Sequence, residues 1–553
     1  MRLPRLERRV GLLFAISLAL LAILFGRAFM LQVLQGDSLA SQASSQQEDI
    51  IEVPGLRGSI LDRNGQPLAG SEPGATIYAT PYQIKNAPEE AKLVADALGT
   101  SPDEVLDAIT QPGGFSYVDR KVDLKKAGRV ERLGLEGIGQ VPDTLRVRPQ
   151  GDIASQVIGA VSDEGDGLTG IEASQNEILT GVNGERRLVK DALGDPISLD
   201  HVRDADDGSS VQLTLDATIQ AEAEKVLAEI GETHTPINAS AIVMDARSSD
   251  ILAMANWPPV DLDDLSDAEP EDLLNVGTSY TYEPGSTFKA FTVASALQSK
   301  TVSPVSTFTL APSIQVFDRT IEESHPRGTV NLSVGDILAQ SSNVGSVTIG
   351  LEMGARKFSR WIDRFGFGTR TGIDYPAEEQ GIVLPYSDWS GSTIGNVPIG
   401  QGLAVTPIQM VQGYGALANG GILRTPRLIE KIDGAEMPAD EGHRIISPQV
   451  AGEVREMLKG VLAPGGTASE VSVPGYTLAG KTGTAQVATE DGYSDTRYVA
   501  SFVGVAPADD PAIVVSIMVN EPQNGHSGAE AAAPGFGELA AFTLPYLGVP
   551  TDQ

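Results

Sequence analysis

At 553 residues the chain is too long for one compact core, and at about 150 residues per domain roughly two to four domains are expected. Its 40 Lys and Arg against 73 Asp and Glu give a formal net charge of −33, which argues against a nucleic-acid partner because nucleic-acid-binding surfaces are basic. The absence of cysteine excludes disulfides and thiol catalysis. The five histidines form no metal-binding spacing, so we expect neither a metal nor a cofactor.

A basic N-terminus precedes a long apolar stretch. Residues 10–26 carry no charge, apolar character continues past Arg27 to Leu34, and the preceding arginines are Arg2, Arg5, Arg8 and Arg9. Spanning a bilayer takes about 20 apolar residues, whereas the apolar region of a cleaved signal peptide is usually about 7–15 residues long. We therefore predict a single uncleaved anchor at 10–34 in the cell membrane. Because basic flanks stay inside, residues 1–9 are expected to be cytoplasmic and the rest extracytoplasmic.

After a polar linker at 35–49, residues 50–205 fit a mixed α+β module. Short strands are expected at 50–54, 75–79 and 82–84, and helices at 89–98, 102–109 and 171–179. Arg57, Arg63 and Glu172 are candidates for structural ion pairs. The Asp- and Gly-rich stretch at 204–208 marks a boundary, after which a second domain runs from 210 to 548.

The second domain opens with a predicted strand at 211–215 and an amphipathic helix at 218–230. Two nearly all-apolar runs, 241–245 and 251–255, predict a hairpin of central strands that are covered on both faces. A short helix is expected at 334–339, and further strands at 498–505 and 512–520. The small-residue tract at 528–535 is most simply a loop.

Ser286 begins the most informative stretch of the chain. Pro284 and Gly285 interrupt what precedes it, and the residues from 287 to 297 suit a helix. A helix N-terminus offers free N–H groups that favour developing negative charge. Lys289 lies three residues on, on the same helical face, so a hydroxyl is paired with a candidate base.

Two later triplets complete a known signature. Ser341-Ser342-Asn343 gives Ser-x-Asn, and Lys481-Thr482-Gly483 gives Lys-Thr-Gly. Ser-x-Asn alone is weak, since residues 174–176 match it too, but Ser-x-x-Lys, Ser-x-Asn and Lys-Thr-Gly in this order are the signature of penicillin-binding proteins and related β-lactamases. Taken singly, Ser286 fits a helix N-cap, Lys289 a solvated helix lysine, residues 341–343 a loop and residues 481–483 a turn.

The resemblance covers nearly the whole chain. Residues 57–65, 146–151 and 170–172 resemble pedestal motifs of class B penicillin-binding proteins, and residues 282–289, 400–407, 480–486 and 500–507 resemble their transpeptidase domain. The Glu-Pro-Gly-Ser-Thr-Phe-Lys form is most similar to the septal, cell-division subclass. The implied fold is α+β: a transmembrane helix, a mixed α+β pedestal of the dimerisation type at 50–205, and an α/β/α transpeptidase domain with a central antiparallel sheet at 210–548.

The resemblance implies a peptidoglycan D,D-transpeptidase that acts on stem peptides ending in D-Ala-D-Ala and is acylated by β-lactams. Ser286 would be the nucleophile and Lys289 its base, which requires a neutral amine whose pKa is lowered by burial or by a nearby cation such as Lys481. The resemblance assigns a proton relay to Ser341 and the stem-peptide amide to Asn343. It places Thr482, Gly483 and Thr484 at the substrate, with Gly483 leaving room for it. It makes the N–H groups of Ser286 and Thr484 the oxyanion hole.

Several alternatives stay open. An elongation-specific transpeptidase, a D,D-carboxypeptidase or β-lactamase that uses water as acceptor, and a non-catalytic scaffold or β-lactam sensor share these motifs. The resemblance also implies a SEDS-family glycosyltransferase as a partner, together with other division proteins, because class B proteins lack a glycan polymerase of their own.

Overall fold

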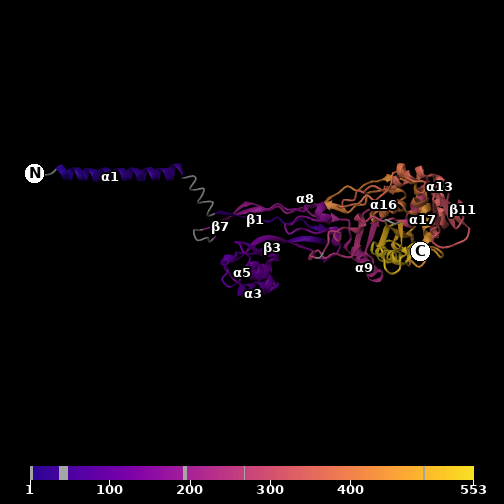
Figure 1. Cartoon of the computed structure of the whole chain (residues 1–553), viewed down its shortest axis with the longest axis horizontal. Helices are drawn as coiled ribbons and strands as arrows, with labels where there is room; N and C mark the ends of the chain where they lie inside the picture. The colour runs from indigo at the N-terminus through magenta and orange to yellow at the C-terminus, as the bar shows by residue number, and fades with distance from the viewer. Residues whose placement is uncertain (1–3, 36–47, 191–195, 267, 490–491, 553) are drawn as a thin grey trace. The chain divides into compact units, whose positions relative to one another are not determined.

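The computed structural model describes residues 4–35, 48–190, 196–266, 268–489 and 492–552 (Figure 1). Within it the chain forms two compact units. The N-terminal unit consists of Met1–Leu56, Glu72–Leu145 and Gly181–Asp207; the catalytic unit consists of Arg57–Ser71, Arg146–Thr180 and Gly208–Gln553. Two stretches that the sequence placed in the pedestal thus pack with the catalytic unit. The domain limits at 50–205 and 210–548 stay predictions. Residues 1–3 of the predicted tail, which include Arg2, and residues 36–47 of the predicted linker lie outside the described residues.

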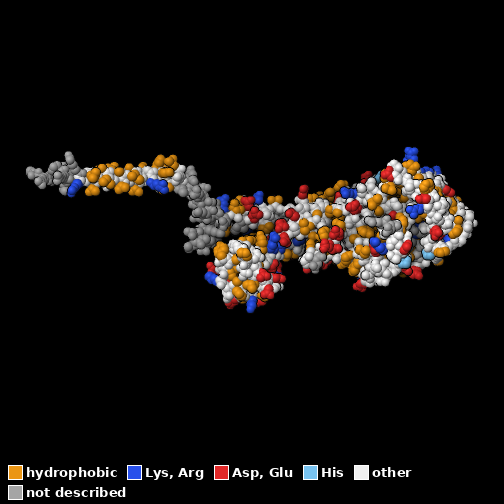
Figure 2. Space-filling model, viewed as in Figure 1, with side chains coloured by type: hydrophobic (Ala, Val, Ile, Leu, Met, Phe, Trp, Pro, Cys, Tyr) orange, Lys and Arg blue, Asp and Glu red, His pale blue; other side chains and the backbone are white. Residues whose placement is uncertain are grey.

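The N-terminal helix is long and apolar enough to cross a membrane. Helix α1 (Pro4–Phe29) continues into a π-helical turn, η1 (Met30–Leu34), and the candidate span covers the 26 residues Arg9–Leu34. At about 1.5 Å per residue this length exceeds the roughly 30 Å of a bilayer core. Apolar side chains cover its surface in Figure 2, and none of the span is buried against protein. The predicted anchor helix is therefore present.

The rest of the N-terminal unit is a small α+β assembly. Strands β1 (Glu48–Val53), β6 (Gly184–Lys190) and β7 (Pro196–Arg203) form an antiparallel sheet. Helices α3 (Ala87–Leu98) and α4 (Pro102–Ile109) confirm the two predicted helices and pack with β4 (Ser116–Asp123) and α5 (Leu124–Glu131). The strand predicted at 82–84 is wrong. Pro81 has a ring-locked φ that suits the start of a helical turn, and Pro81–Gln83 is the 3₁₀ turn η2.

A central antiparallel sheet lies in the catalytic unit, as predicted, and it has five strands. Its strand order is β10-β9-β21-β20-β19, from β9 (Asn238–Asp245), β10 (Ile251–Trp257), β19 (Ala479–Thr489), β20 (Gly492–Ala506) and β21 (Ile513–Asn520). Every residue of β21 is buried, as expected of a strand covered on both faces. The hairpin predicted from 241–245 and 251–255 is the β9–β10 pair.

Helices cover both faces of this sheet and give the predicted α/β/α layers. Helices α9 (Ala217–His234) and α19 (Ala533–Tyr546) pack on one face; α11 (Lys289–Gln298), α16 (Pro407–Ala418) and α17 (Pro448–Leu462) form the other layer. The loop predicted at 528–535 is wrong, because α18 (Gly528–Ala531) and the start of α19 occupy it. A Cβ on Gly535 would lie 2.7 Å from Ile517 and 2.9 Å from Val226, so the small residues allow close packing of α19.

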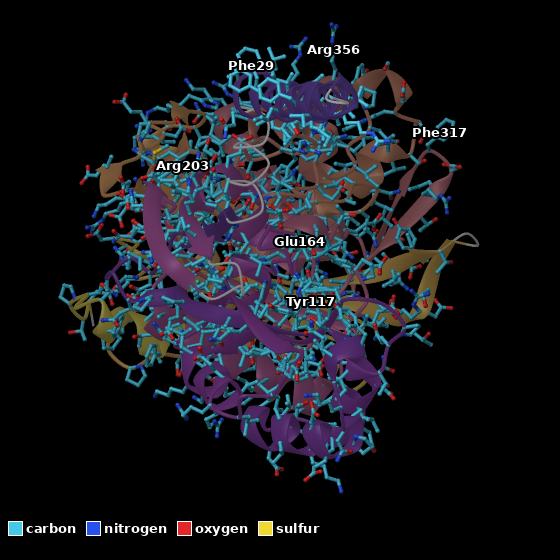
Figure 3. All side chains as sticks on the ribbon, turned by 90° about the vertical axis from the view of Figure 1, so that its left-hand side faces the viewer. Phe29, Tyr117, Glu164, Arg203, Phe317 and Arg356 are labelled. Carbon is cyan, nitrogen blue, oxygen red and sulfur yellow. The ribbon has the colours of Figure 1, made fainter. Side chains whose placement is uncertain are left out.

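Shorter elements complete the chain. The helical ones are α6 (Ser155–Ile158), α7 (Gly170–Ser174), α8 (Asn176–Leu179), α10 (Val276–Ser279), η3 (Gly285–Phe288), α12 (Val334–Ala339), α13 (Asn343–Met353), α14 (Ala355–Arg364), η4 (Tyr386–Asp388), α15 (Thr393–Asn396) and η5 (Val397–Ile399). The strands are β2 (Ile60–Leu61), β3 (Pro67–Ala79), β5 (Ile138–Val147), β8 (Val211–Leu213), β11 (Thr307–Leu310), β12 (Ser313–Val316), β13 (Arg319–Glu322), β14 (Val330–Ser333), β15 (Ile422–Leu423), β16 (Ile429–Ile432), β17 (Ala435–Glu436) and β18 (His443–Arg444). The turn between β12 and β13 projects outward and carries Phe317, which is 77% exposed (Figure 3).

A buried ion triad stabilises the first segments of the catalytic unit. The Glu172 carboxylate accepts from Arg57 Nε at 2.5 Å and from Arg146 Nε at 2.7 Å. Arg57 also donates to Asn176 Oδ1 at 2.8 Å, and Arg146 to the carbonyl of Gly58 at 2.8 Å. The predicted pairing of Arg57 with Glu172 is confirmed. The second partner is Arg146, which the sequence marked only as part of a pedestal motif.

Candidate active site

Ser286 lies in the 3₁₀ turn η3, which leads directly into α11. Gly285 has φ +55°, and its N–H donates to the carbonyl of Gly400 at 3.0 Å. A Cβ at Gly400 would lie 2.1 Å from the Gly285 carbonyl oxygen, so both positions require glycine. Residues three apart eclipse each other in a 3₁₀ turn, which places Lys289 on the side of Ser286. Within the described part of the chain the Ser286 hydroxyl makes no hydrogen bond, so its lone pairs are not engaged.

Lys289 is fully buried and joins two of the predicted motifs. Its Nζ donates to the Ser341 carbonyl at 2.7 Å, to Ser341 Oγ at 3.2 Å and to Asn343 Oδ1 at 2.7 Å. Burial lowers the pKa of Lys289 well below its ordinary 10.5, and the nearby Lys481 ammonium lowers it further, whereas the Glu323 carboxylate acts in the opposite direction. The two causes that we predicted for a neutral amine, burial and a second lysine, are thus both present.

Ser341 has a strained backbone. It lies between α12 and α13 with φ +57°, a left-handed conformation that typically costs a non-glycine residue about 1–3 kcal/mol. The N–H groups of Ser341 and Ser342 donate to the carbonyls of Leu338 and Ile337 at 3.2 and 2.9 Å and hold the turn closed. The turn therefore presents both the carbonyl and the hydroxyl of Ser341 to Lys289.

Lys481 lies on β19 and is also fully buried. Burial lowers the pKa of Lys481 to about 7. Its Nζ donates to the carbonyl and the hydroxyl of Thr482, both at 3.2 Å, and that hydroxyl lies 2.7 Å from Thr467 Oγ1. The charged form of Lys481 dominates below its pKa, and this positive charge lowers the pKa of Lys289.

The remaining part of β19 approaches the turn that carries Ser286. Thr484 is exposed, and its Oγ1 accepts from Gly528 N at 3.0 Å, which leaves the hydroxyl hydrogen available to an anion. A Cβ at Gly483 would lie 2.4 Å from Ser501 Oγ and 2.9 Å from the Pro284 carbonyl oxygen. The missing side chain thus makes room for the protein itself, which differs from the substrate clearance predicted for Gly483.

Comparison with known proteins identifies the family. The profile of the penicillin-binding protein transpeptidase domain matches residues 239–541, and that of the penicillin-binding protein dimerisation domain matches residues 52–213. The chain is a class B penicillin-binding protein. It is 33% identical over 583 residues to penicillin-binding protein PbpB of Mycolicibacterium smegmatis, with 97% of this chain and 90% of the relative covered. It is 31% identical to peptidoglycan D,D-transpeptidase FtsI of Escherichia coli, with 98% and 92% covered.

Solved structures agree with this assignment. The crystal structure of penicillin-binding protein 3 from Mycobacterium tuberculosis, complexed with aztreonam, superposes with a TM-score of 0.71 at 30% identity and covers 91% of this chain and 98% of that one. A peptidoglycan synthetase from Bifidobacterium adolescentis superposes with a TM-score of 0.72 at 27% identity, with 92% and 98% covered. The fold of this penicillin-binding protein is therefore that of a known transpeptidase.

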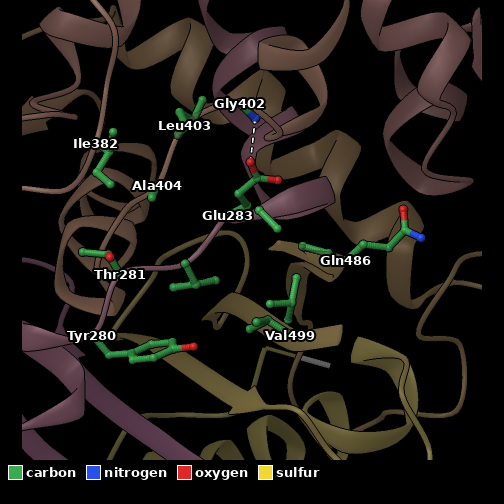
Figure 4. Close-up of a pocket in the computed structure, with 13 residues that line it drawn as sticks. Tyr280, Thr281, Glu283, Ile382, Gly402, Leu403, Ala404, Gln486 and Val499 are labelled. Atoms are coloured by element: carbon green, nitrogen blue, oxygen red, sulfur yellow. Dashed lines mark hydrogen bonds between the residues drawn. The ribbon is translucent and has the colours of Figure 1, made fainter. Parts of the chain in front are cut away.

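A cavity of about 330 Å³ adjoins the turn before Ser286 in this penicillin-binding protein. Figure 4 shows Glu283 within it, and the hydrogen bond from the N–H of Gly402 to its carboxylate is 2.9 Å long. Tyr493 Oη donates to the same carboxylate oxygen at 3.0 Å. Burial raises the pKa of Glu283. The sequence predicts no role for Glu283, because a single acidic residue next to a proline carries no distinguishing pattern.

Two further residues at the site were missed. Glu323 and Arg327 lie in the loop between β13 and β14 and contact the turn that holds Ser342 and Asn343. Their separation of four residues fits any surface ion pair, and nothing in the sequence joins them to positions about 20 residues later. Only the folded chain could reveal this contact.

Proposed function

We propose that this penicillin-binding protein is a serine D,D-transpeptidase that cross-links peptidoglycan stem peptides through an acyl-enzyme at Ser286. One observation carries the proposal. Lys289, one turn after Ser286, is fully buried and contacts Ser341 and Asn343. Its pKa is lowered by burial and by the charge of Lys481. Hydrogen bonds at this amine thus join the Ser-x-x-Lys and Ser-x-Asn motifs, and Lys481 of the third motif acts on it through its charge. Burial that lowers the pKa of a lysine is how proteins prepare it as a base.

In the acylation step the neutral Lys289 amine accepts the proton of Ser286 while Oγ attacks the carbonyl carbon of the penultimate D-Ala. The N–H groups of Ser286 and Thr484 stabilise the oxyanion. The amide C–N bond breaks, a proton passes through Ser341 to the departing amine, and free D-Ala leaves. A β-lactam reacts in the same way, but its opened ring stays attached, so no leaving group makes room for an acceptor.

In the second step an amine of a neighbouring stem peptide attacks the ester carbonyl. A new amide forms, the bond to Ser286 breaks, and a proton returns to its oxygen. Asn343 binds the stem-peptide amide in this scheme, and Gly483 lies on the adjoining strand. Lys481, Thr482 and Thr484 provide positive charge and hydroxyl donors for the terminal carboxylate of the donor peptide.

Ser286→Ala should abolish covalent labelling by a fluorescent penicillin, because no other group replaces the nucleophile. Labelling is read on a denaturing gel, where only a covalent adduct survives. Ser299→Ala, at the end of the same α11 helix, is the matched control and should label as the wild type does. Labelling of the Ser286→Ala protein at the wild-type rate would refute the nucleophile assignment.

The form of the Ser286 motif supports a septal role, with a SEDS-family glycosyltransferase and division proteins as partners, over a role in elongation. Depletion of the protein should then give filaments, since septa would fail while side walls still grow. Cell length under the microscope is the measurement. Rounded cells would instead assign the protein to elongation.

The basic residue Arg9 at the start of the span supports an N-in orientation. The catalytic unit is then extracytoplasmic, on the side of the membrane where peptidoglycan lies. The anchor keeps the enzyme in the cytoplasmic membrane.

A further inference from the structure

The loop between β13 and β14 contributes a carboxylate to the catalytic centre. The Glu323 side chain is 5% exposed and pairs with Arg327, which is 20% exposed, at 2.5 Å. A carboxylate removed from water to this degree needs hydrogen-bond donors around it. The groups that donate hydrogen bonds to Glu323 show which part of the chain the loop holds in place.

Among the described residues, the other donors to Glu323 come from the Ser-x-Asn turn. Its Oε1 accepts from Ser342 Oγ at 2.7 Å, and its Oε2 accepts from the backbone N–H of Asn343 at 2.8 Å. Arg327 Nη2 donates in turn to Ser342 Oγ at 2.7 Å. One carboxylate thus satisfies both the side chain before Asn343 and the first N–H group of α13, which has no partner within the helix.

The consequence reaches Lys289 through Asn343. The Asn343 carboxamide donates from Nδ2 to the carbonyl of Glu322 at 3.0 Å, which directs its Oδ1 to Lys289 Nζ at 2.7 Å. Ser341, whose backbone is strained at φ +57°, immediately precedes this clamped pair. The loop therefore holds Asn343, which Lys289 contacts, and Ser342, which directly follows the second contact residue, Ser341.

We propose that Glu323 is a positioning residue for acyl transfer: its two carboxylate oxygens clamp Ser342 and the N–H of Asn343, so that Asn343 and Ser341 stay in contact with Lys289. This role rests on the proposed transpeptidase function.

The residues of the clamp also carry charge. The charged groups that act on Lys289 are Lys481 from β19 and the pair Arg327 and Glu323 from this loop; the two cations lower the pKa of Lys289, and the carboxylate raises it.

The test measures the rate of acylation by a fluorescent penicillin against pH in the full chain, for Glu323→Gln, Glu323→Asp and Arg327→Gln. Glu323→Gln should lower the rate on the order of 10²-fold, because the base and its neighbours lose their alignment. The rate should fall on the acidic side of its pH profile as Lys289 becomes protonated, and we call this fall the acidic limb. In Glu323→Gln the acidic limb should move to lower pH, since loss of the negative charge lowers the pKa of Lys289. Arg327→Gln removes a positive charge and should move the limb to higher pH.

Two variants separate positioning from folding. Glu323→Asp keeps the charge on a shorter side chain, so its acidic limb should stay at the wild-type pH while its rate lies between those of wild type and Glu323→Gln. Glu352→Gln removes an exposed carboxylate from α13 and should match the wild type. The proposal would be overturned if Glu323→Gln had the acylation rate and the acidic limb of the wild type. It would also be overturned if Glu323→Gln had a lower melting temperature but its folded molecules were labelled at the wild-type rate, since the role of Glu323 would then be structural. If Glu323→Gln is labelled at the wild-type rate and Ser286→Ala is not labelled, only the proposed role of Glu323 is wrong. If Ser286→Ala is labelled, the proposed transpeptidase mechanism is wrong as well.

Discussion

Lys289→Met should lower the rate of acylation by a fluorescent penicillin by about 10²- to 10⁴-fold, the usual contribution of a general base. Methionine keeps the length of the side chain but cannot accept the proton of Ser286. The replacement removes a buried amine but leaves the Ser341 carbonyl and Asn343 Oδ1 without their donor, so the melting temperature is measured beside the rate to show that the variant folds. Lys357→Met, on the exposed face of α14, is the matched control and should leave the rate unchanged.

The wild-type rate should depend on pH as a bell. The neutral form of Lys289 is needed, so activity is lost as the pH falls through its pKa, which lies well below 10.5. The charged form of Lys481 is needed, so activity is lost as the pH rises through its pKa of about 7. Molecules with neutral Lys289 and charged Lys481 are the main species between the two pKa values when Lys289 has the lower one, and a minor species when it has the higher one. In Lys289→Met the acidic limb should disappear; an unchanged limb, or an unchanged rate, would show that another group is the base.

Glu172→Gln should destabilise the catalytic unit by about 3–5 kcal/mol, the typical cost of breaking a buried ion pair. The amide has the same shape but leaves the Arg57 and Arg146 guanidiniums without their shared anion, at a site where Glu172 is 1% exposed. Burial already lowers the pKa of Arg146, and the Glu172 charge opposes that effect. The free energy of unfolding in denaturant is the measurement.

The control for this prediction is Glu177→Gln, an exposed residue of α8 five positions later. It should change the free energy of unfolding by less than about 0.5 kcal/mol, as surface substitutions usually do. Equal stability of the Glu172→Gln and Glu177→Gln proteins would mean that water or another donor set compensates for the lost charge. The triad would then contribute little to the fold.

Local pattern predicted most of the catalytic unit because its strands and helices have simple signatures. The apolar runs at 241–245 and 251–255 predicted covered strands, and the structure has β9 and β10 there; α12 lies at Val334–Ala339, as predicted. The errors have physical reasons. Small residues at 528–535 are typical of loops, but here their size allows α19 to pack against the sheet, which depends on Val226 and Ile517 far away in the chain.

Only those residues of the site that belong to the three sequence motifs could be predicted. Order and spacing brought Ser286, Lys289, Ser341, Asn343 and Lys481 into one hypothesis, and the structure places Lys289 against Ser341 and Asn343. The clamp by Glu323 and the second guanidinium of the triad could not be predicted in this way. Both depend on single side-chain hydrogen bonds across 20 to 26 residues, which leave no periodic pattern.

At Ser341, the residue that would be best for stability differs from the residue that the proposed reaction needs, because its backbone is left-handed. Glycine would adopt this conformation without strain, so a search for a more stable protein, guided by backbone energy alone, would select it. The same exchange would take from Lys289 the only hydroxyl within its hydrogen-bond reach among the described residues. Engineering of this enzyme for thermal robustness should therefore leave position 341 unchanged, because the energy stored there belongs to the reaction rather than to the fold.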